Sequence, residues 1–144
     1  MHHSESAEQT MELGAEIGRR LGRGDVVALH GPLGAGKTTL VKGIARSLGI
    51  VESVTSPSFT LIAEYEGMQE ERPLVLYHVD LYRISHAQEI ADLGIEEILN
   101  GEGICVIEWA EKAAEFLPDS AIHVDITIKE GGERSVEISG LSGL

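Results

Sequence analysis

The segment with the clearest chemistry is residues 31–38, which reads Gly-Pro-Leu-Gly-Ala-Gly-Lys-Thr and matches the pattern G-x-x-x-x-G-K-[ST]. Glycines permit backbone conformations that other residues avoid, so successive N–H groups can point into one concavity. We expect the backbone of Gly34, Ala35 and Gly36 to line that concavity. Such a concavity attracts anions, and so does the N-terminus of a helix that follows it. The segment therefore predicts a phosphate-binding loop.

The three residues that close this segment have separate expected roles. The Lys37 ammonium should reach the β- and γ-phosphates of a nucleotide. The Thr38 hydroxyl should bind Mg²⁺, and Thr39 should lie near the α-phosphate. Together they predict that the chain binds a nucleoside triphosphate, namely ATP with Mg²⁺.

A triphosphate site also needs a carboxylate near the metal, typically at the carboxyl end of a neighbouring strand. Asp80 follows an apolar run that ends at Val79, and Glu108 follows the apolar run 104–107. We expect Glu108 to act as in a Walker-B arrangement, by binding the metal through water, by orienting the attacking water, or both. Asp80 is a second candidate metal contact. The alternative for either residue is a solvated carboxylate at a strand end.

Other residues near these positions leave two readings open. Trp109 directly follows Glu108 and either packs in the core or contacts the nucleotide or a partner. The hydroxyl-rich segment 53–60 is either a switch that senses the γ-phosphate or a capped proline turn. Arg83 either touches a phosphate or a partner, or lies on the surface. His78 and His86 lack metal-ligand spacing, so we interpret them as structural residues.

The elements expected around the loop supply the strand–loop–helix context that the motif requires. Ser6 and Gln9 have capping-box spacing, and the apolar residues that follow predict a helix ending near Gly22. The β-branched run 26–29 predicts a buried strand. Residues 37–48 predict a helix that stops at glycine 49.

Downstream of these elements, the pattern alternates between strands and short helices. Residues 58–65 and 74–79 predict two strands joined by a polar loop over 67–73, which is too short for a helical crossover and so implies an antiparallel pair. Ser85 and Gln88 have capping-box spacing, and short helical segments should continue to about residue 99.

The last third of the chain completes the predicted fold. It should contain a buried strand over 104–107, a helix over 110–116 closed by Pro118, and a terminal hairpin over 122–138. These elements predict an α/β fold of the P-loop NTPase type, as a single domain over residues 1–144. The expected sheet mixes parallel and antiparallel strands and is flanked by helices.

Composition limits the classes of partner. The 144 residues include 11 Lys and Arg against 24 Asp and Glu, so the formal net charge is −13. Direct, tight binding of nucleic acid is therefore not expected, because it requires clustered basic residues, whereas a basic protein partner fits. A single cysteine, no leader-like N-terminus and no apolar stretch long enough for a membrane span predict a cytoplasmic protein.

Four segments taken together resemble one family: Gly-Pro-Leu-Gly-Ala-Gly-Lys-Thr-Thr at 31–39, Ser-Pro-Ser-Phe-Thr-Leu at 56–61, His-Val-Asp-Leu-Tyr-Arg at 78–83 and Ile-Glu-Trp at 107–109. The sequence is similar to the TsaE (YjeE) family, the small ATPase of the bacterial tRNA threonylcarbamoyladenosine machinery. The similarity extends from Thr10 to about Pro118. The last two segments are much more specific than the glycine-rich one.

The resemblance implies a weak, magnesium-dependent ATPase that protein partners of the threonylcarbamoyl-transferase complex stimulate. Such a protein supports turnover of that complex, meets tRNA only indirectly, and does not itself transfer the threonylcarbamoyl group to the adenosine beside the anticodon.

The resemblance also assigns roles to residues. It implies that Lys37 and Thr38 hold phosphate and Mg²⁺, that Asp80 and Glu108 serve the metal and hydrolysis, and that Trp109 lies close by. In addition, Thr10 matches a threonine that lies at the nucleotide in family members. Ser58 occupies a position where the family usually has threonine.

Two other classes compete with this interpretation. A small-molecule P-loop kinase would cover its phosphates with an arginine-rich lid, whereas the seven arginines here do not cluster. A regulatory GTPase would carry a guanine-reading Asn-Lys-x-Asp segment. The only asparagine, Asn100, is followed by glycine, so that segment is absent.

Overall fold

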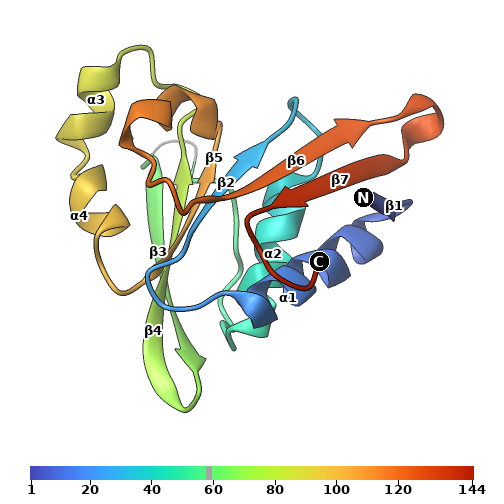
Figure 1. Cartoon of the computed structure of the whole chain (residues 1–144), viewed down its shortest axis with the longest axis horizontal. Helices are drawn as coiled ribbons and strands as arrows, with labels where there is room; N and C mark the ends of the chain where they lie inside the picture. The colour runs from blue at the N-terminus through green and yellow to red at the C-terminus, as the bar shows by residue number, and fades with distance from the viewer. Residues whose placement is uncertain (58–59) are drawn as a thin grey trace.

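The computed structural model describes residues 1–57 and 60–144. Within them, seven strands form one sheet in the order β1-β7-β6-β2-β5-β4-β3 (Figure 1). The strands are β1 (His2–Ser4), β2 (Val26–His30), β3 (Ile62–Gln69), β4 (Arg72–Asp80), β5 (Ile104–Glu108), β6 (Ile122–Ile128) and β7 (Arg134–Ser139). The helices are α1 (Ala7–Arg20), α2 (Lys37–Ser47), α3 (Ala87–Asp92) and α4 (Ile95–Leu99), with 3₁₀ segments η1 (Ala110–Phe116) and η2 (Glu130–Gly132).

The centre of the sheet is parallel and its two sides are antiparallel. Strand β2 pairs in parallel with β5 and β6, and β4 pairs in parallel with β5. Strand β3 runs antiparallel to β4, and β7 runs antiparallel to both β6 and β1. This arrangement confirms the predicted mixed α/β sheet and the antiparallel pair β3–β4. It also brings the carboxyl ends of the central strands to one edge, where Asp80 pairs in register with Glu108.

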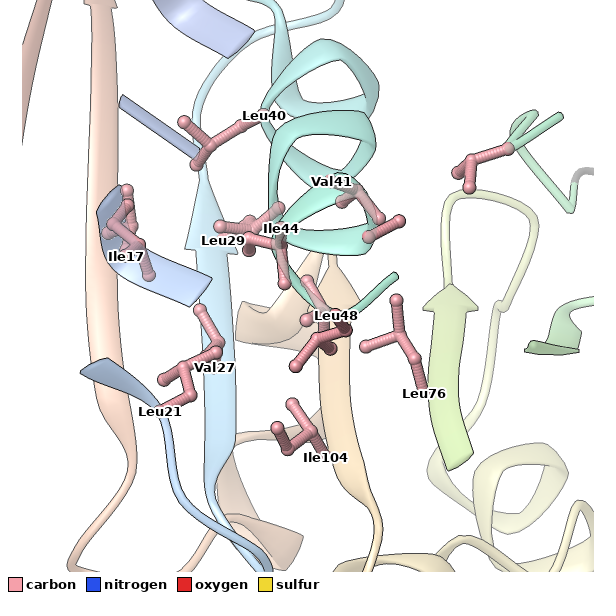
Figure 2. Packing of buried hydrophobic residues seen from close by; sticks show 14 of the residues in the cluster. Ile17, Leu21, Val27, Leu29, Leu40, Val41, Ile44, Leu48, Leu76 and Ile104 are labelled. Carbon is pink, nitrogen blue, oxygen red and sulfur yellow. The ribbon is translucent and has the colours of Figure 1, made fainter. Parts of the chain in front are cut away.

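One face of the sheet is covered by α1 and α2. Val27 and Leu29 of β2 point into this layer and are fully or almost fully buried with Ile17 of α1 and Ile44 of α2 (Figure 2). The two helices approach closely because small residues lie between them. A Cβ on Gly14 would stand 2.2 Å from the carbonyl oxygen of Leu40. This close packing brings the first turn of α1 beside the start of α2.

The opposite face is covered by α3, α4 and η1 (Figure 1). Val26 and Ala28 alternate with the residues of the first face and pack with Ile90, Ile95 and Ala110. Strand β2 is therefore buried on both sides, which is why its sequence is continuously apolar rather than alternating.

The hairpin β3–β4 is longer than the sequence predicts. The polar segment 67–73 was expected as a loop, but pairing continues to Gln69 opposite Arg72, and only Glu70 and Glu71 form the turn. The Arg23 guanidinium donates hydrogen bonds to the carbonyls of Gln69, Arg72 and Pro73 and holds this end in place. The loop prediction is therefore wrong. The strand predicted from residue 58 begins at Ile62, and residues 58–59 lie outside the described part of the chain.

Two local predictions at helix starts had different outcomes. The Ser6 cap is confirmed, because the Ser6 hydroxyl accepts a hydrogen bond from the Gln9 N–H at 3.1 Å. The capping box at Ser85 and Gln88 is wrong. The Glu89 carboxylate instead accepts the N–H groups of Ser85 and His86, and these bonds lower the pKa of Glu89.

Two more elements depart from expectation. Strand β1 was not predicted, because its three residues gain their pairing only from distant β7. Residues 110–116 form a helix as predicted, but of 3₁₀ type.

Candidate active site at the carboxyl edge of the sheet

The glycine-rich loop, residues 31–36, joins β2 to α2. Gly31, Gly34 and Gly36 all have positive φ angles, of 152°, 81° and 104°. Gly31 also has no room for a side chain, because a Cβ there would stand 2.8 Å from the carbonyl oxygen of Ile126. Gly36 is the N-cap of α2 and provides no side-chain cap, so the first-turn N–H groups remain available. The loop thus has the backbone geometry that an anion cradle requires.

Lys37 begins α2, and its side chain turns back over the loop. Only 5% of the residue is exposed, and Nζ donates a hydrogen bond of 2.8 Å to the Gly31 carbonyl. The same atom lies 3.6 Å from the ring centroid of Trp109. Burial lowers the pKa of Lys37, while the carboxylates of Glu108, Glu111 and Asp80 act in the opposite direction. A buried cation at a helix N-terminus is well suited to bind phosphate.

Glu108 ends β5 and lies against the start of α2. The Thr38 hydroxyl donates a 3.0 Å hydrogen bond to its Oε2, and only 4% of Glu108 is exposed. Oε2 also lies 2.5 Å from Nε2 of His78, which is fully buried on β4. The sequence predicts only a structural role for His78, because it has no metal-ligand spacing. The signal that would have placed it is the two-residue period of β4, since His78 and Asp80 share one face and Asp80 pairs with Glu108.

Asp80 ends β4 and is also almost buried, at 6% exposed. Its Oδ2 accepts a hydrogen bond of 2.7 Å from the Ser56 hydroxyl, and its Oδ1 accepts one of 3.0 Å from the Tyr82 N–H. The two predicted carboxylates are therefore neighbours, but each has its own set of donors.

Trp109 follows Glu108 with a left-handed backbone, at φ 59° and ψ 40°, which a bulky residue rarely adopts. Its ring lies 5.1 Å from that of Tyr82, centroid to centroid. Lys112 of η1 donates hydrogen bonds to the carbonyls of Tyr82 and Ile84, and these bonds connect the segment after β4 to η1. Trp109 both packs on the α3–α4 side of the core and lines the cavity beside Lys37, so neither of its two readings excludes the other.

Two cavities flank the glycine-rich loop. One, of about 500 Å³, is lined by most of the predicted site residues, but not by Thr10 or Ala35. Its lining is Leu33, Gly34, Gly36, Lys37, Thr38, Thr39, Ser56, Asp80, Tyr82, Arg83, Glu108 and Trp109. The other, of about 320 Å³, lies on the α1 side and is lined in part by Thr10, Gly34, Ala35, Thr39 and Arg134. A larger cavity of about 740 Å³ lies under the β3–β4 hairpin and contains none of the predicted site residues.

A protein-family model described as "Threonylcarbamoyl adenosine biosynthesis protein TsaE" matches residues 4–136. This chain belongs to the TsaE family. A relative from Treponema pallidum, named tRNA threonylcarbamoyladenosine biosynthesis protein TsaE, is 43% identical over 136 residues, which cover 94% of this chain and 97% of the relative.

Two further similarities come from Bacillus subtilis. A protein of the same name is 46% identical over 116 residues, covering 81% of this chain and 68% of the relative. The crystal structure of YdiB matches with a TM-score of 0.78 and 35% identity, covering 94% of this chain and 80% of that one.

Arg134 is a residue of this TsaE family member that sequence reasoning missed. Its guanidinium donates hydrogen bonds to the carbonyls of Ala35 at 3.0 Å and Gly34 at 3.1 Å. The two peptide planes are thereby held with their oxygens on the Arg134 side. No local pattern signals this contact, because Arg134 lies 99 residues beyond Ala35.

The oxygen-rich character of the site suits the metal that the motif predicts. Thr38, Asp80 and Glu108 provide hydroxyl and carboxylate oxygens, which Mg²⁺ prefers together with phosphate and water. Across residues 1–57 and 60–144, no three His, Cys, Asp or Glu side chains are grouped to hold a metal by themselves. Mg²⁺ commonly binds in this way, through one or two protein groups and the substrate's phosphates.

Three further features belong to other parts of the chain. Ser58 lies outside the described residues. Burial raises the pKa of the Cys105 thiol to about 12, because the thiolate form would lose its solvation in the core. In the part of the chain that the structure describes, no helix combines the length and apolar character needed to cross a membrane.

Proposed function

We propose that this chain binds and slowly hydrolyses Mg·ATP, and that this hydrolysis supports threonylcarbamoyl modification of the tRNA adenosine beside the anticodon. The main support is the convergence of a buried Lys37, the free first turn of α2 and the Thr38–Glu108 hydrogen bond on one cavity. The family membership and the printed names of the relatives support the part in tRNA modification.

The loop residues fit the polyphosphate part of the nucleotide. In the proposal, backbone N–H groups of residues 34–39 bind phosphate oxygens, and Lys37 exchanges the Gly31 carbonyl for the β- and γ-phosphates. Thr10 and Thr39 line the smaller cavity, which we assign to the nucleoside end.

The hydroxyl and carboxylate groups fit the reacting end. Thr38, Asp80 and Glu108 would hold magnesium, which when bound neutralises phosphate charge and aligns the γ-phosphoryl group. Glu108 orients the attacking water, and its low exposure keeps bulk solvent away from that carboxylate.

The mouth of the cavity supports a role for protein partners. Leu33 at the loop tip is 70% exposed and Tyr82 is 50% exposed, although both line the cavity. We propose that components of the threonylcarbamoyl-transferase complex cover this mouth and stimulate hydrolysis. The formal net charge of −13 fits contact with tRNA only through that complex. We also propose a cytoplasmic location, on the ground that the relatives' printed name assigns them to tRNA modification.

Calorimetry with Mg·ATP tests the proposal directly. Lys37→Ala should lose measurable binding, because it removes the only side-chain cation that we assign to the phosphates. Lys42→Ala is the matched control, since Lys42 is exposed on the same helix. Hydrolysis by the unchanged chain should be slow alone and faster with the transferase proteins. Equal binding by the Lys37 and Lys42 variants would contradict the proposal.

A further inference from the structure

His78 is a polar side chain in the interior of the sheet. It is fully buried on β4, and its Nε2 lies 2.5 Å from Oε2 of Glu108. An imidazole is costly to bury unless its polar atoms find partners. Among residues 1–57 and 60–144, the partner of the His78 imidazole is the Glu108 carboxylate.

The contact fixes the position of the imidazole proton. An ionised carboxylate only accepts hydrogen bonds, so Nε2 must be the donor. Nδ1 is buried and has no hydrogen-bond partner among the described residues. A proton on Nδ1 would therefore be a buried donor without an acceptor. An unprotonated Nδ1 is instead an unsatisfied acceptor, which costs less free energy. The surroundings select the tautomer with hydrogen on Nε2.

Two donors meet at the same oxygen of Glu108. His78 reaches Oε2 from β4, and the Thr38 hydroxyl reaches it from α2 at 3.0 Å. Among the described residues, both hydrogen bonds to this carboxylate fall on Oε2. These two contacts hold the carboxylate through one oxygen and leave Oε1 available, and Glu108 as a residue lines the cavity.

We propose that His78 is a positioning residue for Glu108. Its Nε2–H donor holds Oε2 against the Thr38 hydroxyl and so presents Oε1 to the reacting end of the nucleotide. Without it, Glu108 would keep one of its two hydrogen bonds within the described part of the chain, the one from Thr38, and its side chain could adopt other rotamers. The predicted effect of His78 on turnover rests on the proposed ATP hydrolysis. The hydrogen bond between His78 and Glu108 can be tested without measuring hydrolysis.

Substitutions of His78 separate positioning from simple packing. The amide nitrogen of glutamine lies the same number of bonds from Cα as Nε2 of histidine, so His78→Gln keeps the donor. His78→Leu keeps comparable volume and removes it. Leu76→Val is the control, because Leu76 is equally buried two residues earlier on the same strand and lies in the apolar cluster.

Steady-state kinetics with the partner proteins should show a split. His78→Leu should lower kcat by roughly 10–100-fold, the range for loss of a hydrogen bond that orients a site residue. KM for ATP should change little, and His78→Gln should recover most of kcat. Equal rates in His78→Leu and unchanged protein would overturn the positioning role. Loss of kcat in Leu76→Val as large as in His78→Leu would also overturn it.

A nuclear magnetic resonance measurement tests the same contact independently of hydrolysis. In the unchanged chain, ¹⁵N shifts should show His78 protonated at Nε2 and bare at Nδ1, with a strongly downfield Nε2 proton. That proton should move upfield in Glu108→Ala. A His78 protonated at Nδ1, or a proton signal indifferent to Glu108→Ala, would overturn the inference even if His78→Leu fails to fold. If the chain hydrolyses no ATP but shows this signature, the proposed function fails while the hydrogen bond stands.

Discussion

Glu108 and Asp80 end adjacent parallel strands and pair in register, but different parts of the molecule hold them. Glu108 is held by Thr38 on α2 and by His78 on β4, which are both regular elements. Asp80 is held by Ser56 and by the Tyr82 N–H, which both belong to loops. Two carboxylates at equivalent strand ends are thus coupled to different structures. The orientation of Glu108 depends on α2, which follows the phosphate-binding loop, and on β4. The orientation of Asp80 depends on the loops that border the cavity.

The difference predicts unequal roles. A side chain fixed by a helix and a strand keeps its orientation before the substrate arrives, which is what a group that orients water requires. A side chain fixed by loops follows those loops, so it suits a contact that forms or adjusts when the nucleotide binds. We therefore expect Glu108 to dominate turnover and Asp80 to contribute less to turnover and more to metal-dependent binding.

The largest effect should come from Glu108→Gln. Glutamine keeps the size of the side chain and can still accept from Thr38 and His78, but it lacks the negative charge that activates water. Hydrolysis should fall by at least about 100-fold, in the range for loss of a general base, while Mg·ATP still binds. Phosphate release and calorimetry measure the two quantities. Glu115→Gln, an exposed glutamate on η1, is the control.

A smaller effect is expected from Asp80→Asn. The amide can still accept the Ser56 hydroxyl and the Tyr82 N–H, so the loops should stay in place, but one negative charge near the metal is lost. We expect the Mg²⁺ concentration for half-maximal hydrolysis to rise by roughly tenfold, with a milder loss of kcat. Asp92→Asn on α3 is the control. A greater loss of kcat in Asp80→Asn than in Glu108→Gln would reverse the comparison.

The same contrast explains which parts of the site could be predicted. The loop residues follow one another in the chain, so the motif and the strand before it are enough to place Lys37 and Thr38. Asp80 and Glu108 follow from two apolar runs, because parallel strands end at a common edge.

His78 and Arg134 could not be placed in this way. His78 acts on a residue 30 positions away, and Arg134 acts on one 99 positions away. The two-residue period of β4 puts His78 on the same face as Asp80, but strand order and register decide which residues meet there, and the sequence around each residue encodes neither. The β3–β4 loop was wrong for a related reason, since cross-strand pairing and Arg23 hold polar residues in strands that their composition does not favour.

The smallest effect should come from Ser56→Ala, which weakens the support of Asp80 alone. It removes one hydrogen bond to Oδ2 but leaves the charge and the Tyr82 contact in place. A hydrogen bond of this kind contributes about 0.5–1.5 kcal/mol, so metal-dependent affinity for ATP should fall by about 2–10-fold. Ser53→Ala is the control, because Ser53 is exposed in the same segment. If Ser56→Ala instead lowered kcat as much as Glu108→Gln, the loops around Asp80 would govern water activation, and Glu108 would lose the role that its rigid setting implies.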